Sequence, residues 1–145
     1  MVNLQTFNRI MEKTAHIALA TSKDNKANVR VMTIWYNLAN KGVIYFPTEK
    51  TSLKTKEFAH NSEVAFTTIA NFQNGIVRVK SAAVKKSQLT VDDIKDGIIK
   101  NAPVFANTLQ RLGKDVFDVY EVHFDRAYVT VFSATEAQEN VEVAI

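Results

Sequence analysis

The strongest constraint on the fold is a succession of short apolar runs, most with the alternating pattern of a strand and most bounded by polar turn residues. Asn, Lys and Gly in 37–42 and the Asn-Gly pair at 74–75 are typical turn residues. Short strands joined in this way favour an antiparallel β-barrel, closed or partly closed, over a doubly wound parallel sheet. The expected strands are 15–21, 28–38, 43–46, 63–70, 75–86, 116–124 and 127–132.

Helical patterns lie at the periphery of this β framework. Residues 3–14 form an amphipathic helix by their apolar spacing, and three further helices are expected at 51–59, 91–101 and 103–112. The sequence therefore predicts a mainly β protein with peripheral helices. Three details are also predicted: the 28–38 strand is covered on both faces, the third strand stops at Pro47, and 134–145 is a loose tail or an interface strand.

Composition narrows the function classes. The 145 residues suit one domain, 1–145, and the absence of cysteine excludes disulfides, thiolate nucleophiles and thiolate metal sites. The three histidines are too scattered for a metal motif. No signal peptide or apolar stretch of about 20 residues occurs, so we expect a cytoplasmic protein without a membrane partner. A net charge of +3 without basic blocks weakly favours an anionic ligand.

One segment carries the residue types of a phosphate site. Arg30 lies on an early strand, and Thr51 and Ser52 begin a helix whose first turn contains Lys54. A helix N-terminus offers free N–H groups and partial positive charge, which suit a phosphate. The lysine adds a full charge, and the arginine adds a planar fork that matches phosphate oxygens. Helix capping is the commoner use of Thr and Ser here, and one site can serve both purposes.

This segment resembles the FMN site of the pyridoxamine 5′-phosphate oxidase-like family. The shared pattern is Arg-x-x on an early strand, then an aromatic residue and a Thr, then Ser-x-Lys. The resemblance implies an antiparallel split β-barrel of the FMN-binding type, with FMN as cofactor and its phosphate on Arg30, Ser52 and Lys54. Further contacts implied for the flavin come from the backbone at Val31, Met32, Thr33, Phe46 and Thr48, and from Lys50.

The sequence also departs from this family. Ser81 stands where many relatives have glycine, and Leu53 where the true oxidases often add a basic residue. The segment 122–126 offers no match to the arginine and histidine with which the true oxidases hold pyridoxine phosphate. We therefore do not expect a true pyridoxamine 5′-phosphate oxidase, and no catalytic residue is identified.

The resemblance implies a homodimer with flavin sites at the subunit interface. The leading interpretation is an oxidoreductase that passes electrons or hydride between a reduced donor, such as a nicotinamide, and an unidentified small molecule. The alternative is a flavin- or haem-binding carrier, sensor or stress protein without turnover, and His123 is the histidine that could line a haem pocket. A third interpretation, single-stranded nucleic-acid binding through Trp35, Phe46 and Phe72, is not favoured.

Overall fold

The computed structural model describes residues 2–69, 75–132 and 139–145. Nine strands and four α-helices lie in these ranges, together with one short 3₁₀ helix, η1. The chain order is α1 (Leu4–Glu12), β1 (His16–Lys23), β2 (Lys26–Thr33), β3 (Trp35–Tyr36), β4 (Val43–Glu49), α2 (Leu53–His60), β5 (Glu63–Thr68), β6 (Ile76–Lys86), α3 (Val91–Asn101), α4 (Val104–Leu112), η1 (Lys114–Val116), β7 (Phe117–His123), β8 (Arg126–Val131) and β9 (Glu139–Ala144).

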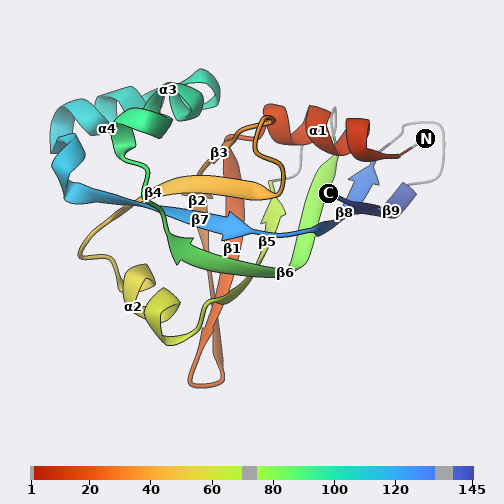
Figure 1. Ribbon diagram of the computed structural model, residues 1–145, viewed down its shortest axis with the longest axis horizontal. Coiled ribbons are helices and arrows are strands. Elements are labelled where there is room, and N and C mark those ends of the chain that lie inside the picture. Colours follow the sequence, from red (N-terminus) through yellow and green to blue (C-terminus); the bar gives the residue numbers. More distant parts are fainter. Residues whose placement is uncertain (1, 70–74, 133–138) are drawn as a thin grey trace.

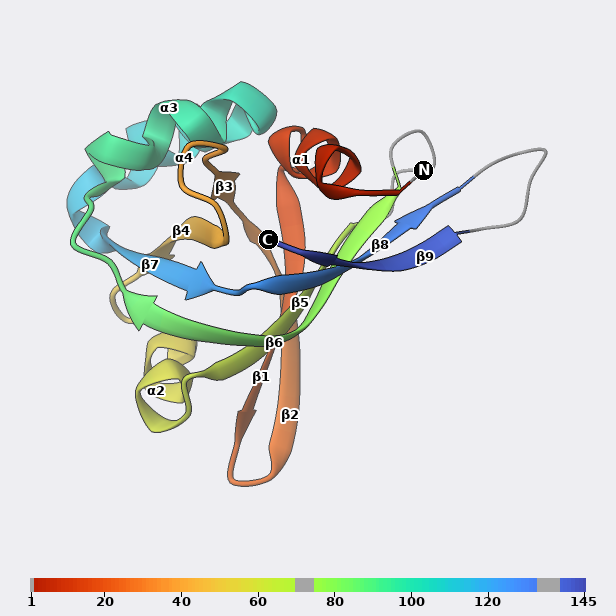
Figure 2. The same cartoon turned by 45° about the vertical axis from the view of Figure 1, so that its right-hand side comes forward.

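The strands form one antiparallel sheet in the order β2-β1-β5-β6-β7-β4-β3. The pair β8-β9 branches from β6. The sheet curls so that β2 and β4 approach each other, yet they do not pair and the barrel stays open there. The mainly antiparallel β architecture with peripheral helices is therefore confirmed, and Figures 1 and 2 show the long β1-β2 hairpin extending beyond the rest of the sheet.

Two apolar clusters hold the fold together. The larger fills the inside of the curled sheet, where Phe7, Ile17, Leu19 and Val122 are fully buried. Its Phe7 comes from α1, whose apolar face packs over one end of the strands as the sequence spacing predicts (Figure 2). The smaller cluster lies on the opposite face of β4 and β7, under α3 and α4 (Figure 1). Successive side chains of β4 thus face different cores.

Close packing fixes α3 against β3. At Gly97 in α3, an added Cβ would lie 2.2 Å from the indole nitrogen of Trp35. The Trp35 ring in turn packs on Tyr45 of β4, with 5.6 Å between the ring centroids. Position 97 therefore requires glycine because a side chain would collide with Trp35. Its backbone is ordinary helix, so backbone conformation does not require glycine there.

The sequence predicts that the strand beginning at Val43 ends at Pro47. The structure shows that this strand, β4, continues through Pro47 to Glu49. Proline lacks the N–H group that a strand bordered on both sides would need. Beyond Tyr45, however, β4 pairs only with β7, because β3 contacts β4 only at Tyr45 and Ile44. The proline is tolerated because this part of β4 is an edge.

The prediction that 28–38 is one strand covered on both faces is wrong. The segment divides at Ile34 into β2 and β3, and the two lie at opposite edges of the sheet. On β2 the side chains of Val29 and Val31 are 64% and 62% exposed. An apolar run can thus belong to an edge strand with one uncovered face.

The end of the chain is better ordered than a loose tail. Residues 139–144 form β9, which pairs with β8 of the same chain from Arg126–Ala144 to Val131–Glu139. Among the described residues β9 pairs only with β8, so the interface-strand interpretation stays a prediction. Residues 134–138, the expected turn at 71–74 and Phe72 lie outside the described residues.

Candidate functional site

The predicted phosphate site centres on Arg30, and the structure places its guanidinium in a network rather than in solvent. Arg30 Nη1 donates to Thr21 Oγ1 at 2.8 Å and to the Leu19 carbonyl at 3.3 Å. Its Nη2 donates to Glu57 Oε2 at 2.7 Å. Both neighbours on β1 follow from the antiparallel register, in which Arg30 lies opposite Leu19. The guanidinium is therefore held in a fixed orientation against α2.

Glu57 is the residue that the sequence did not indicate. Besides Arg30, its carboxylate accepts hydrogen bonds from the Thr21 hydroxyl and from Asn28 Nδ2. The pKa of Glu57 is lowered, chiefly by the Thr21 hydrogen bond and also by those from Arg30 and Asn28, although burial opposes this. Glu57 is three residues after Lys54, a spacing that places both on one helix face. That spacing was the only available sequence signal.

Lys54 is the second cation of this site and has no ion-pair partner among the described residues. It lies half-buried in the first turn of α2, and in the described part of the chain no carboxylate is within ion-pair distance of its ammonium group. Its pKa is lowered, first by burial and then by the Arg30 guanidinium, while Glu49 and Glu57 partly offset these effects. Burial beside another cation is unfavourable for a charged ammonium group, and a bound anion would relieve it.

The start of α2 has the predicted capping geometry. Ser52 is the N-cap, and its hydroxyl accepts from the Lys54 backbone N–H at 3.2 Å. Its carbonyl accepts from the Thr55 hydroxyl at 2.8 Å. Thr51 is exposed and precedes the cap. Ser52 and Lys54 therefore lie together at the start of α2, one turn before Glu57, whose carboxylate is 2.7 Å from the Arg30 guanidinium.

Phe46 and Thr48 of β4 both have buried side chains. The Phe46 ring is fully buried between Phe58 and Tyr120, with centroid distances of 5.9 Å to each, so its side chain is not available to a ligand. Thr48 is 3% exposed, and its hydroxyl has no hydrogen-bond partner among the described residues. An unpaired buried hydroxyl costs roughly 1–3 kcal/mol. Thr48 therefore places a polar group where an apolar side chain of the same shape would be more stable.

The three predicted contacts on β2 differ in exposure. Val31 is exposed, Thr33 is partly buried and the Met32 side chain points into the core. All three belong to the edge strand that faces the opening between β2 and β4. Their backbone therefore lies along the unpaired edge of β2, and their contact with a flavin stays a prediction.

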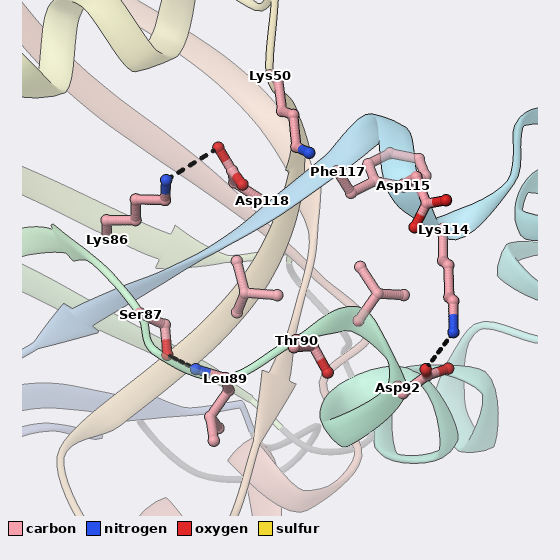
Figure 3. Close-up of a pocket in the computed structure, with 12 residues that line it drawn as sticks. Lys50, Lys86, Ser87, Leu89, Thr90, Asp92, Lys114, Asp115, Phe117 and Asp118 are labelled. Carbon is pink, nitrogen blue, oxygen red and sulfur yellow. Dashed lines mark hydrogen bonds and ion pairs between the residues drawn. The ribbon is translucent and has the colours of Figure 1, made fainter.

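Lys50 lies apart from the Arg30 network. It lines a separate cavity of about 380 Å³ formed by the end of β6, the start of α3, η1 and β7, and Figure 3 shows its side chain at this cavity. Two ion pairs border the same cavity: Lys86 with Asp118 at 3.4 Å, and Lys114 with Asp92 at 2.7 Å (Figure 3). The structure thus brings Arg30, Ser52 and Lys54 together but does not add Lys50 to them.

A flat patch lies beside this site on the outer face of the sheet. Val29 and Val31 stand opposite Ala20 and Ala18 of β1, which in turn stand opposite small residues of β5. Directly opposed residues share one face of a sheet. We call this surface the outer patch; it consists of Ala18, Ala20, Val29, Val31, Ala65 and Thr67.

Two basic side chains border the opposite end of the same sheet face. Arg78 of β6, opposite Thr67, and Lys80 lie over the Tyr128 ring, 5.9 and 5.2 Å from its centroid. These distances allow cation–π attraction. The exposed face therefore has an apolar part on β1, β2 and β5 and a basic, aromatic part on β6 and β8.

Comparison with known proteins identifies the family. A model of the pyridoxamine 5′-phosphate oxidase-like family matches residues 10–134, which include all of the candidate site. The chain belongs to this family. The sequence pattern that includes Arg30, Thr48 and Lys54 predicted this family, and the family assignment is confirmed. No curated protein sequence matches the chain.

Solved structures agree with the family fold. A Clostridium acetobutylicum protein related to general stress protein 26, of the pyridoxinephosphate oxidase family, has a TM-score of 0.67 at 8% identity, over 98% of this chain and 94% of that one. A FAD-binding protein of Mesorhizobium loti has a TM-score of 0.61 at 12% identity, over 88% and 92%. A heme binding protein of Mycobacterium smegmatis has a TM-score of 0.66 at 11% identity, over 94% and 56%.

Two further findings concern membrane-spanning helices and metal-binding groups. In the described part of the chain, no helix combines the length and apolar character needed to cross a membrane. Across the same residues, no group of His, Asp and Glu is arranged to hold a metal ion.

Proposed function

We propose that this protein binds FMN at the opening between β2 and β4 and uses it to transfer electrons or hydride. The observation that carries the proposal is the half-buried Lys54, which has no carboxylate within ion-pair distance among the described residues and lies close to Arg30. Glu57 already pairs with Arg30, so Arg30, Glu57 and Lys54 together keep one positive charge. A phosphate would balance that charge, and it suits both the planar guanidinium and the helix start. Ser52 adds a hydroxyl at the same point.

The flavin ring would lie along the unpaired edges. On one side is the backbone of 31–33 in β2, and on the other the backbone of 46–48 in β4. FMN would supply the redox chemistry, while the chain holds the phosphate, orients the ring and limits access of water. The reduced donor is a nicotinamide or a similar compound, and the acceptor is a small molecule. The FAD-binding neighbour supports a flavin on this fold.

We further propose a homodimer formed through the outer patch. Val29 and Val31 are exposed on an edge strand, and their neighbours on β1 and β5 are small, so another sheet could pack closely against them. The patch shares β2 with Arg30, whose side chain lies on the opposite face of the sheet, so a partner subunit seated there would border the flavin site by reaching around the edge of β2. A surface of this kind favours protein association over exposure to water.

The geometry of β7 and β8 argues against a true pyridoxamine 5′-phosphate oxidase. His123 Nε2 lies 2.7 Å from Glu121, while Arg126 Nη1 lies 3.5 Å from Glu142 of β9. Each side chain is therefore paired with its own carboxylate, and the two do not form a shared anion site. The substrate is accordingly a different small molecule.

Equilibrium dialysis against FMN, followed by absorbance of the protein compartment, tests the proposal. We expect uptake of one FMN per chain, with a shifted flavin spectrum, and oxidation of NADH or NADPH by the loaded protein. FMN uptake without nicotinamide oxidation would indicate a flavin carrier. Failure to retain any FMN at micromolar protein and ligand would refute flavin binding.

Haem is the alternative ligand, and the heme binding neighbour supports it. A haem iron needs a free imidazole nitrogen, but Nε2 of His123 is already paired with Glu121. The same dialysis with haemin discriminates the two cofactors, because a protein-induced Soret shift that is lost in His123→Ala would favour haem.

A further inference from the structure

The cation pair proposed to hold phosphate already contains an anion of the protein itself. Glu57 Oε2 is 2.7 Å from Arg30 Nη2, and the two side chains are only 15% and 18% exposed. The charges of Arg30, Lys54 and Glu57 therefore sum to one positive charge. That is less than the nearly two negative charges of a phosphate monoester at neutral pH.

Glu57 is fixed in this position. Its carboxylate accepts from Thr21 on β1, from Arg30 on β2 and from Asn28 at 3.2 Å. Withdrawing it to solvent would break all three bonds and leave the Thr21 hydroxyl proton and one side of the guanidinium without an acceptor. Incoming phosphate must therefore bind the remaining donors of Arg30 while Glu57 stays on the same guanidinium.

Two anions on one guanidinium repel each other, and burial strengthens the repulsion. We infer that Glu57 weakens the hold on the flavin phosphate, so that FMN is an exchangeable ligand, taken up and released as a substrate or cargo, and not a permanently bound group. The inference rests on the proposed flavin function. Glu57 has a second effect, because it holds Arg30 in the orientation that the phosphate meets.

Glu57→Gln separates the two effects. Glutamine keeps the shape and one oxygen acceptor for Thr21 and Arg30. The exposed Asn28 amide would have to turn to meet the glutamine NH2 group, and this turn gives up its 2.9 Å bond from the Val29 N–H to water. The charge is therefore the main loss. We expect Glu57→Gln to bind FMN about tenfold more tightly, mostly through slower release, which is the size of a like-charge effect at a partly exposed site.

The matched controls are riboflavin, which lacks the phosphate, and Glu49→Gln. Glu49 is an exposed carboxylate that also acts on Lys54 but does not contact Arg30. We expect riboflavin affinity to be unchanged in Glu57→Gln, and FMN affinity in Glu49→Gln to change by less than about threefold. The measurement is flavin fluorescence titration with stopped-flow release rates, on variants whose folding is checked by circular dichroism.

The outcomes are distinct. Tighter FMN binding confined to Glu57→Gln supports the inference. Binding of FMN that is equal or weaker in Glu57→Gln, or a gain shared by riboflavin, overturns it and leaves flavin binding intact. If neither the wild type nor the variant binds FMN, the proposed function itself is wrong, and the inference fails with it.

Discussion

At the scale of single residues, the main property of the site is the balance between the charges of Arg30, Glu57 and Lys54. Arg30 forms an ion pair with Glu57, whereas no described carboxylate lies within ion-pair distance of Lys54. The two cations are therefore expected to have different roles. Arg30 connects β2, β1 and α2 and would orient the proposed ligand, whereas Lys54 would supply the net charge that attracts it.

Arg30→Ala should destabilise the fold, because it leaves the Glu57 carboxylate partly buried without its cation. We expect a loss of about 1–2 kcal/mol in the free energy of unfolding, less than for a fully buried pair because both side chains retain some exposure. Urea unfolding followed by circular dichroism measures it. Arg30→Lys retains the charge and should lose less free energy of unfolding. Equal stability of Arg30→Ala and wild type would show that the ion pair with Glu57 contributes nothing to stability.

Thr48→Val should stabilise the protein by about 0.5–1 kcal/mol, since valine has nearly the same shape and removes a buried hydroxyl without a partner. Thermal unfolding measures the change. As a control, Thr21→Val removes a buried hydroxyl that is hydrogen-bonded to Glu57 and Arg30, and should destabilise. Destabilisation by Thr48→Val would mean that its hydroxyl is paired in the native protein.

Which site residues the sequence could reveal depended on whether their signal was local. Ser52 and Lys54 were predictable because capping and helix-terminal charge act within one turn. The partnership of Arg30 with Glu57 was not, because it depends on packing of α2 against β1 and β2, across 27 residues of chain. Lys50 shows the converse: it is adjacent to the site in sequence, its side chain lines another cavity, and its contact with the flavin stays a prediction.

At the scale of elements, β4 is the organising strand. One face contributes Phe46 to the barrel interior, and the other contributes Tyr45 to the cluster under α3 and α4. The helical pair thus supports the strand whose edge borders the proposed flavin. Its position depends on the contact between Trp35 and Gly97.

Gly97→Ala should cost about 1–3 kcal/mol despite alanine being the better helix former, because the new methyl group overlaps the Trp35 ring. The shift is measurable by urea unfolding and by the near-ultraviolet circular dichroism of Trp35. Asp96→Ala, at an exposed neighbouring position of α3, should change stability by less than about 0.5 kcal/mol. A neutral Gly97→Ala would show that α3 is not packed so closely.

Element type was predictable from sequence here, but strand limits and coverage were not. The runs at 43–46 and 28–38 were identified as strands from their apolar pattern, yet Pro47 continued one and Ile34 divided the other. Both results depend on which neighbours each strand acquires, which is a property of the whole sheet. The same applies to 139–144, whose strand exists because β8 offers it a partner.

At the scale of the whole molecule, the unclosed sheet and the outer patch are two aspects of one arrangement. β2 is both an edge of the opening and the strand that carries Val29 and Val31. Association of two copies through this patch would cover the apolar side chains and place a second chain beside the flavin. Dimerisation and flavin affinity are therefore expected to change together.

Val31→Glu should convert the dimer to a folded monomer and weaken FMN binding at least tenfold, because it places a charge in the centre of the proposed interface. Analytical ultracentrifugation and fluorescence titration measure the two effects. Val104→Glu, at an equally exposed valine on α4, is the control and should change neither. A wild-type protein that is monomeric yet binds FMN fully would contradict the dimer proposal.

The most direct test of the central claim, that Arg30 and Lys54 hold the flavin through its phosphate, compares FMN with riboflavin in the wild type and in Lys54→Ala. Charge-assisted hydrogen bonds are worth roughly 1.5–3 kcal/mol, so the wild type should prefer FMN by at least tenfold. Lys54→Ala should lose most of that preference while its riboflavin affinity stays the same. An undiminished preference for FMN in Lys54→Ala would show that the phosphate is bound elsewhere.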